Sequence, residues 1–237
     1  IIGVFEGKVK IMRVSQIGSL AWDQDKNIDS SKTTYDNDWS TSSLQVLLNT
    51  SYLNRTANVT YYSGSSGTTT TTVSTSTIGI KDSTRNMISE SMWYLRGWNN
   101  TSVYSDQIYN YERTTGSVYN ETTRDKSWTG KIALAYPSDY GYAADLSQCT
   151  IQLSSYNDST CTSNNWMKSI FTASYIWLLT PSSGDSSLVW RVNGSGYLSR
   201  FNAYVEYGVR PVLFLDSELG IKAGDDGSNS APYQLSA

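Results

Sequence analysis

Residues 175–215 decide the fold of this chain. They hold three short apolar runs, YIWLLTP (175–181), SLVWRVNGSGYL (187–198) and YGVRPVLFL (207–215). A Thr-Pro pair, an Asn-Gly pair and a glycine punctuate these runs, and such residues end strands or form tight turns. Short β-rich runs bounded in this way are typical of hairpins. The stretch therefore predicts a compact antiparallel sheet near the C-terminus.

The composition of the chain narrows its class. With 237 residues the chain can bury a core, and its eight tryptophans and 18 tyrosines argue against disorder. Charged residues make up only 16%, and the net charge of −3 gives no electrostatic attraction for nucleic acid or an anionic membrane. No apolar run approaches the ~20 residues of a membrane helix.

Histidine is absent from the sequence. This excludes Ser-His and Cys-His nucleophiles and removes the commonest zinc ligand. We therefore predict no catalytic residue of those kinds. We also expect no metal site and no cofactor.

Two cysteines, Cys149 and Cys161, lie twelve positions apart in a polar segment. Zinc needs more ligands than this pair, and the spacing is not that of a dithiol redox motif. We expect a disulfide that stabilises the fold by about 3 kcal/mol, with two free buried thiols as the alternative. A disulfide implies an oxidising compartment outside the cytosol.

Local patterns in the first half predict a hairpin and two helices. Residues 3–14 alternate around a Glu-Gly turn, as a β-hairpin does. Capping residues precede apolar residues at helical spacing over 38–52. A second helix is expected over 82–93, with Met92 in its apolar stripe and Gly97 as its C-cap.

The other segments give weaker patterns. Residues 63–77, rich in Ser, Gly and Thr, are expected to form a loop insertion, with a threonine-rich strand ribbon as the alternative. Tyr and Thr nearly alternate over 104–129, which predicts surface β-structure. Residues 131–136 read as a buried strand, and 228–237 as an edge strand that returns to the opening hairpin.

Together these elements predict an α+β fold in one domain spanning residues 1–237. It would have two main helices and a central antiparallel sheet closed by the C-terminal strands. Because the strands come in hairpins and not in βαβ units, a doubly wound fold is not expected.

Three tracts carry a family resemblance. They are YDNDWS with LQVLLN (35–40 and 44–49), KIALAYPSDYGYA (131–143) ahead of the paired cysteines, and WLLTP with GVRPVL (177–181 and 208–213). Together they resemble an uncharacterised group of secreted domains from gut-dwelling Gram-positive bacteria.

The resemblance implies a fold and an extracellular location, but no reaction. The group is similar to C-type-lectin-like and formylglycine-generating-enzyme-like folds, in which an arginine-bearing strand completes a central sheet. Members often follow a hydrophobic pilin-like helix, which would explain the start at Ile1 within a strand. The reactive cysteines of sulfatase-activating enzymes have no counterpart in Cys149 and Cys161, so that chemistry is not carried over.

A candidate ligand-binding face follows the Asn-Gly turn. Tyr197, Arg200, Asn202, Tyr204 and Glu206 alternate along a polar segment. Tyrosines mixed with Asn and Arg form recognition surfaces in antibody paratopes. A solvated strand face is the alternative.

Three residues of the closing stretch are expected to be structural. Trp177 and Trp190 would pack in the core, although exposed tryptophans can stack on sugars. Arg210 would clamp a carbonyl or an acid within the fold, with a ligand anchor as the alternative.

Acidic residues offer two further possibilities. Glu90, Glu112, Glu121 and Glu206 could supply the paired carboxylates of glycoside cleavage, which must lie about 5–9 Å apart. Residues 225–229 could offer oxygens to calcium but lack the bidentate acidic residue of a twelve-residue loop, so a turn is predicted.

We therefore expect a non-enzymatic, extracellular domain of a bacterial cell-surface or pilin-like protein, serving adhesion or recognition. Its partner would be a protein or a glycan, with no nucleic acid and no membrane contact by this segment, whose anchor lies outside this sequence. Two alternatives stay open: a structural subunit that self-assembles into an appendage, and a carbohydrate-active enzyme with two acidic residues.

Overall fold

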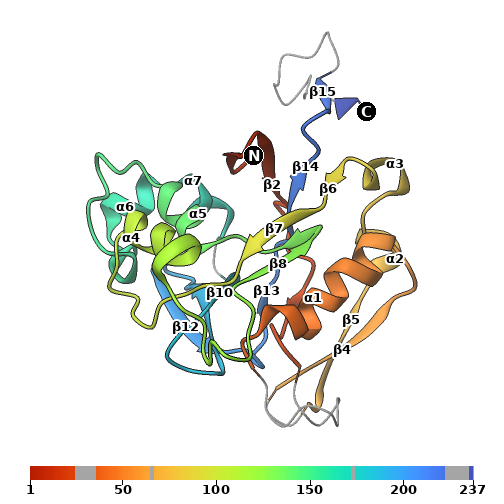
Figure 1. The fold of residues 1–237 in the computed structure, drawn as a ribbon, viewed down its shortest axis with the longest axis horizontal. Helices are drawn as coiled ribbons and strands as arrows, with labels where there is room; N and C mark the ends of the chain where they lie inside the picture. Colours follow the sequence, from red (N-terminus) through yellow and green to blue (C-terminus); the bar gives the residue numbers. More distant parts are fainter. Residues whose placement is uncertain (25–35, 65–66, 172–173, 222–234, 237) are drawn as a thin grey trace.

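The computed structural model describes residues 1–24, 36–64, 67–171, 174–221 and 235–236. Within them the fold is α+β, with several sheets and short helices (Figure 1). The strands are β1 (Gly3–Phe5), β2 (Lys8–Met12), β3 (Ser19–Leu20), β4 (Val59–Ser63), β5 (Thr69–Val73), β6 (Ile88–Ser89), β7 (Ser91–Tyr94), β8 (Ser127–Gly130), β9 (Ile132–Ala133), β10 (Ile176–Pro181), β11 (Leu188–Val192), β12 (Leu198–Asn202), β13 (Tyr207–Gly208), β14 (Val212–Leu215), β15 (Gly220–Ile221) and β16 (Leu235–Ser236).

The helices are each one or two turns long. The α-helices are α1 (Ser43–Leu47), α2 (Thr75–Ile78), α3 (Asp82–Arg85), α4 (Ser105–Asn110), α5 (Pro137–Tyr142), α6 (Ser159–Ser163) and α7 (Trp166–Ile170). Two 3₁₀ turns, η1 (Trp39–Thr41) and η4 (Leu153–Ser155), and two π-helical turns, η2 (Leu48–Tyr52) and η3 (Tyr111–Thr115), complete the set. The expectation of two main helices was therefore wrong, although the helix predicted over 38–52 is present as η1, α1 and η2.

The opening hairpin forms as predicted and joins the C-terminal strand. Glu6 and Gly7 both have positive φ, 51° and 79°, which is the geometry of a two-residue hairpin turn. Strand β14 lies between β2 and β6 in the sheet order β1-β2-β14-β6, and β9 also pairs with β14. The two ends of the chain thus build one sheet.

The closing stretch is divided between two sheets, which corrects the expected central sheet. Strands β10, β11 and β12 form an antiparallel meander in a second sheet, ordered β12-β11-β10-β13-β3. The chain leaves this sheet after Gly208, and Pro211 precedes β14. Proline cannot donate a ladder hydrogen bond, so the pairing changes partner there. No closed sheet forms among the described strands.

The segment 82–93 is not a single helix. Helix α3 ends at Arg85, and β6 and β7 follow. In β7 the burial alternates, with Trp93 buried and Met92 half exposed, which is the period of a strand. Gly97 caps no helix: its amide donates to Ser117, and a Cβ there would lie 2.0 Å from the Pro181 carbonyl oxygen.

Three further expectations differ from the structure. Residues 69–73 form β5, paired with β4, so the threonine ribbon and not the loop is present. The start of 104–129 is helical, as α4 and η3 with Ile108 buried, and β-structure in this range is limited to the first residues of β8 and an isolated bridge at Ser117. Strand β16 pairs with β15 instead of the hairpin, and residues 222–234 lie outside the described part.

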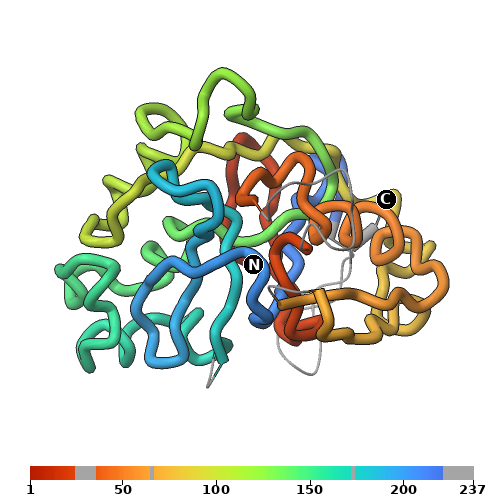
Figure 2. Tube along the Cα trace, turned by 90° about the horizontal axis from the view of Figure 1, so that it is seen from below, coloured from red at the N-terminus to blue at the C-terminus, as the bar shows by residue number. Residues whose placement is uncertain are grey.

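Helices α4–α7 gather on one side of the sheets, and α1–α3 with the β4–β5 ribbon lie on the other (Figure 1). A second direction of view shows the same separation (Figure 2). One continuous cluster of buried side chains joins the two sides. Its largest members are five fully buried tryptophans, Trp22, Trp39, Trp93, Trp177 and Trp190. Among the described helices, none has the length and apolar character needed to cross a membrane.

Candidate functional site

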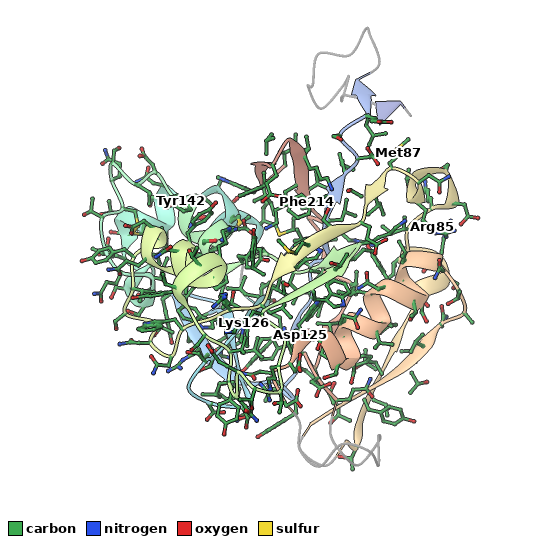
Figure 3. The ribbon with its side chains drawn as sticks, in the orientation of Figure 1. Arg85, Met87, Asp125, Lys126, Tyr142 and Phe214 are labelled. Atoms are coloured by element: carbon green, nitrogen blue, oxygen red, sulfur yellow. A yellow bond between two sulfur atoms is a disulfide. The ribbon has the colours of Figure 1, made fainter. Side chains whose placement is uncertain are left out.

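A cavity of about 330 Å³ opens beside the opening hairpin, and we call it the hairpin pocket. The hairpin forms one wall, β7 a second, and the α4–η3 segment a third. Its aromatic lining consists of Phe5, Tyr94, Tyr109, Tyr136 and Phe214. Figure 3 shows Phe214 on β14 next to the hairpin, with Tyr142 farther toward the helical side. The pocket is thus built by segments from both ends of the chain and from its middle.

Four charged side chains also line the hairpin pocket: Glu6, Lys8, Lys10 and Arg113. Lys10 is 1% exposed, and its Nζ lies 2.5 Å from an Asp139 carboxylate oxygen. The same Nζ lies 4.4 Å from the ring centre of Tyr136. Burial lowers the pKa of Lys10, and the Asp139 carboxylate opposes this. The pair joins β2 to α5.

Arg113 forms a second ion pair, with the buried Glu112. Arg113 Nη1 is 2.8 Å from Glu112 Oε2, and the Ser138 backbone amide donates to Glu112 Oε1 at 3.1 Å. The Ser138 hydroxyl donates to Glu112 as well. Burial raises the pKa of Glu112 to about 7, although Arg113 and the Ser138 hydroxyl favour its charged form. Glu112 therefore changes charge near neutral pH.

The stretch at 136–141 organises both pairs. Pro137 begins α5 at a position that needs no backbone donor. Asp139 accepts from the amide of the N-cap residue Tyr136 at 2.7 Å, so the carboxylate of the capping box also holds Lys10. The π-helical turn η3 carries Glu112 and Arg113; such turns are frequent at functional sites.

The described lining of the hairpin pocket offers no pair of exposed carboxylates for catalysis, since Glu6 is its one acidic residue. Glu112 does not line the cavity, and Ser138 and Arg113 occupy its oxygens. The lining instead presents cations and tyrosine hydroxyls. This chemistry suits recognition by charge and hydrogen bonding.

The structure brings together part of the face predicted after the Asn-Gly turn. Arg200 donates to the Ser182 hydroxyl at 2.7 Å, and Asn202 accepts from Ser187. The Asn202 amide lies 3.5 Å from the Tyr204 hydroxyl. Arg200 and Asn202 thus hold the β10–β11 connection in place.

The other two residues of that face lie apart from this contact. Tyr197 closes the hairpin turn, where its carbonyl accepts from the Asn193 amide at 2.8 Å. Glu206 has one buried oxygen with no hydrogen-bond partner among the described residues. The five residues therefore do not form one continuous binding face.

The opposite face of the second sheet carries an aromatic cluster that the sequence did not indicate. The Arg191 guanidinium lies 4.3 to 4.5 Å from the ring centres of Tyr175, Phe201 and Tyr207. Strand periodicity puts Arg191 and Phe201 on one face, but Tyr175 and Tyr207 join them only through the β10–β13 pairing.

The three residues expected to be structural lie inside the fold. Trp177 and Trp190 are fully buried, and their indole nitrogens donate to the carbonyls of Leu20 and Trp98. Arg210 Nη2 donates to the Ile170 carbonyl at 2.8 Å. Burial lowers the pKa of Arg210. The two tryptophans pack in the core, whereas Arg210 holds a carbonyl through one nitrogen and its buried Nε and Nη1 have no hydrogen-bond partner among the described residues.

The two cysteines are paired as expected. Cys149 and Cys161 form a disulfide with a Cα–Cα distance of 4.7 Å, and both side chains are buried. The bridge closes the loop that contains η4 and the start of α6.

The four candidate glutamates are dispersed. Glu121 forms a surface pair with Lys126 at 2.9 Å, and Glu90 is exposed. The acid that does lie near Glu112 is Asp139, which was not among the candidates. Residues 225–229 lie outside the described part, and the described residues contain no group of three or more potential metal ligands.

Comparisons of the chain with protein families, curated proteins and solved structures find no significant match.

Sequence reasoning missed the hairpin pocket. Only Glu112 was a candidate among the residues of its two buried pairs. One available signal was Lys10, a lysine inside an alternating hairpin whose neighbours are apolar. A charge at such a position needs a buried partner.

Proposed function

We propose that this chain is an extracellular recognition domain of a bacterial surface protein and that it binds its ligand in the hairpin pocket. The observation that carries the proposal is this cavity of about 330 Å³, which lies in the size range of ligand sites. Lys10, Arg113 and Tyr136 are held by buried partners, so this part of the wall is preorganised.

The disulfide between Cys149 and Cys161 supports an oxidising location. The pairing of β14 with the opening hairpin is compatible with a C-type-lectin-like arrangement, in which the strand after an arginine completes a sheet. We propose adhesion or ligand display as the role of the domain, without catalysis. The resemblance of its sequence motifs to secreted bacterial domains is in keeping with this role.

The experiment is an array of neutral glycans, acidic glycans and surface proteins, probed with the purified chain and with Tyr109→Ala. Tyr109 is 38% exposed and lines the pocket. The matched control is Tyr119→Ala, because Tyr119 is 40% exposed and does not line this cavity.

We expect binding that Tyr109→Ala weakens and Tyr119→Ala leaves unchanged. Equal effects of the two substitutions would remove the hairpin pocket from the proposal. If the purified chain binds none of the probes and forms filaments, the result would instead support the alternative of an appendage subunit.

A further inference from the structure

The side chains that line the hairpin pocket carry more positive than negative charge. Lys8, Lys10 and Arg113 line it, against Glu6 alone. The acids that balance Lys10 and Arg113 are Asp139 and Glu112, which are buried and do not line this cavity. A ligand in the pocket therefore meets the cations at shorter range than their counterions.

The two accessible cations still have hydrogen-bonding capacity. Arg113 uses only Nη1 toward Glu112, Ser138 and the Tyr109 carbonyl, and no described residue accepts from its Nε or Nη2. Lys8 is half-buried, contacts the Ser91 hydroxyl at 3.4 Å and makes no ion pair with a described residue. A planar guanidinium with free donors suits a carboxylate.

The aromatic lining disfavours a cationic ligand. Where a lining ring faces a cation, that cation is the protein's own: Arg113 lies 3.8 Å from the centre of Tyr109 and 4.8 Å from that of Tyr136. Lys10 lies 5.2 Å from the ring of Phe5 and 5.7 Å from that of Phe214. A ligand cation would be repelled at short distance.

Neutral hydrogen-bonding groups complete the lining. Among the described residues, no partner engages the hydroxyls of Tyr94 and Tyr109, and the Ser91 hydroxyl also lies in the wall. Ring faces beside free hydroxyls suit a polyhydroxylated ring, since tyrosine provides both apolar area and a polar group.

We propose that the hairpin pocket binds acidic sugars, with the sugar carboxylate held by Arg113 and Lys8 and the ring lying against Tyr94 and Tyr109. This inference rests on the proposed recognition function. It adds that the positive charge of the pocket selects acidic over neutral ligands.

The test uses the complete chain and isothermal titration calorimetry. The probes are trigalacturonic acid and its methyl ester, which keeps the ring and removes the charge. We expect the acid to bind and the ester to bind at least about tenfold more weakly, the effect of losing a charge-assisted pair. An aspartate-rich peptide is the third probe, and we expect it to bind more weakly than the acid.

The variants are Lys8→Gln and Arg113→Gln, with Lys81→Gln as the control because Lys81 is exposed and does not line the pocket. Each pocket variant should weaken binding of the acid by about tenfold, and the control should not. Lys8 makes no ion pair with a described residue, so Lys8→Gln tests the inference even if Arg113→Gln impairs folding.

Equal binding of acid and ester would overturn the charge selection while leaving the recognition function in place. Equal or tighter binding of the peptide would overturn the assignment to sugars. No binding of the acid, with binding of other glycans on the array, would overturn this inference alone. If neither calorimetry nor the array detects binding of any probe, both proposals are overturned.

Discussion

Replacing Glu112 with glutamine should remove a large part of the pH dependence of stability between pH 4.5 and 7. Glu112 is fully buried, and burial raises its pKa from 4.5 to about 7. In that interval the folded protein binds a proton that the unfolded chain does not. Stability therefore falls as the pH rises through this window, and the contribution of protonated Glu112 is complete only below about 4.5.

The size of the effect follows from the same two values. The interval from 4.5 to about 7 corresponds to about 3 kcal/mol, at about 1.4 kcal/mol for each pH unit. The groups that face Glu112 are Arg113 on its own turn, Ser138 and Asp139 on α5, and, at longer range, Lys10 and Tyr136. Glutamine keeps a similar shape and removes the titration.

The assay is urea unfolding followed by tryptophan fluorescence at several pH values across this range. Wild type should lose about 3 kcal/mol more than Glu112→Gln between pH 4.5 and 7. The control is Glu90→Gln, because Glu90 is exposed, and it should follow wild type. If Glu112→Gln keeps the full pH dependence of wild type, the reasoning from burial is wrong.

Two further predictions concern stability. Lys10→Met leaves the buried Asp139 carboxylate with the Tyr136 amide but without its cation, and should lower the free energy of unfolding by about 3–5 kcal/mol. Adding Asp139→Asn should recover part of this loss in denaturant titrations, and strictly additive losses would contradict a coupled pair. Replacing Cys149 and Cys161 by serine should cost about 3 kcal/mol, measured as a lower urea midpoint, and an unchanged midpoint would contradict a stabilising role of the disulfide.

Local chemistry was a good guide where a short motif specifies a conformation. The Glu6-Gly7 turn, the caps ahead of α1 and the Cys149–Cys161 bridge all follow from neighbouring residues. Each depends on backbone geometry or on closure of a loop of at most twelve positions. Such features need no knowledge of distant segments.

Periodicity was misleading where distant packing sets the outcome. Residues 82–93 satisfy a helical pattern, yet Trp93 lies opposite Trp128 in the β7–β8 pair. The tyrosines and threonines of 104–129 alternate like a strand, yet burial of Ile108 favours α4. In both segments tertiary contacts outweigh weak propensities.

The candidate site shows the same limit. Arg200 and Asn202 of the predicted face both contact the β10–β11 connection, Arg200 through one guanidinium nitrogen and Asn202 through its side-chain oxygen. Residues in the hairpin pocket come from the start, the middle and the end of the chain. No spacing in the sequence can show that Lys10 and Asp139 meet.

The amino-acid sequence alone predicted the α+β composition and the opening hairpin from turn chemistry and local alternation, and the disulfide from the polar segment that holds both cysteines. It also excluded histidine-based catalysis outright. Tertiary structure decided that the closing strands belong to two sheets and that Lys10, Arg113, Glu112 and Asp139 share one buried site. The reason is that a buried charge needs a partner. Lys10 meets Asp139 across 129 positions of the chain, and only the fold brings Ser138, 26 positions away, against Glu112.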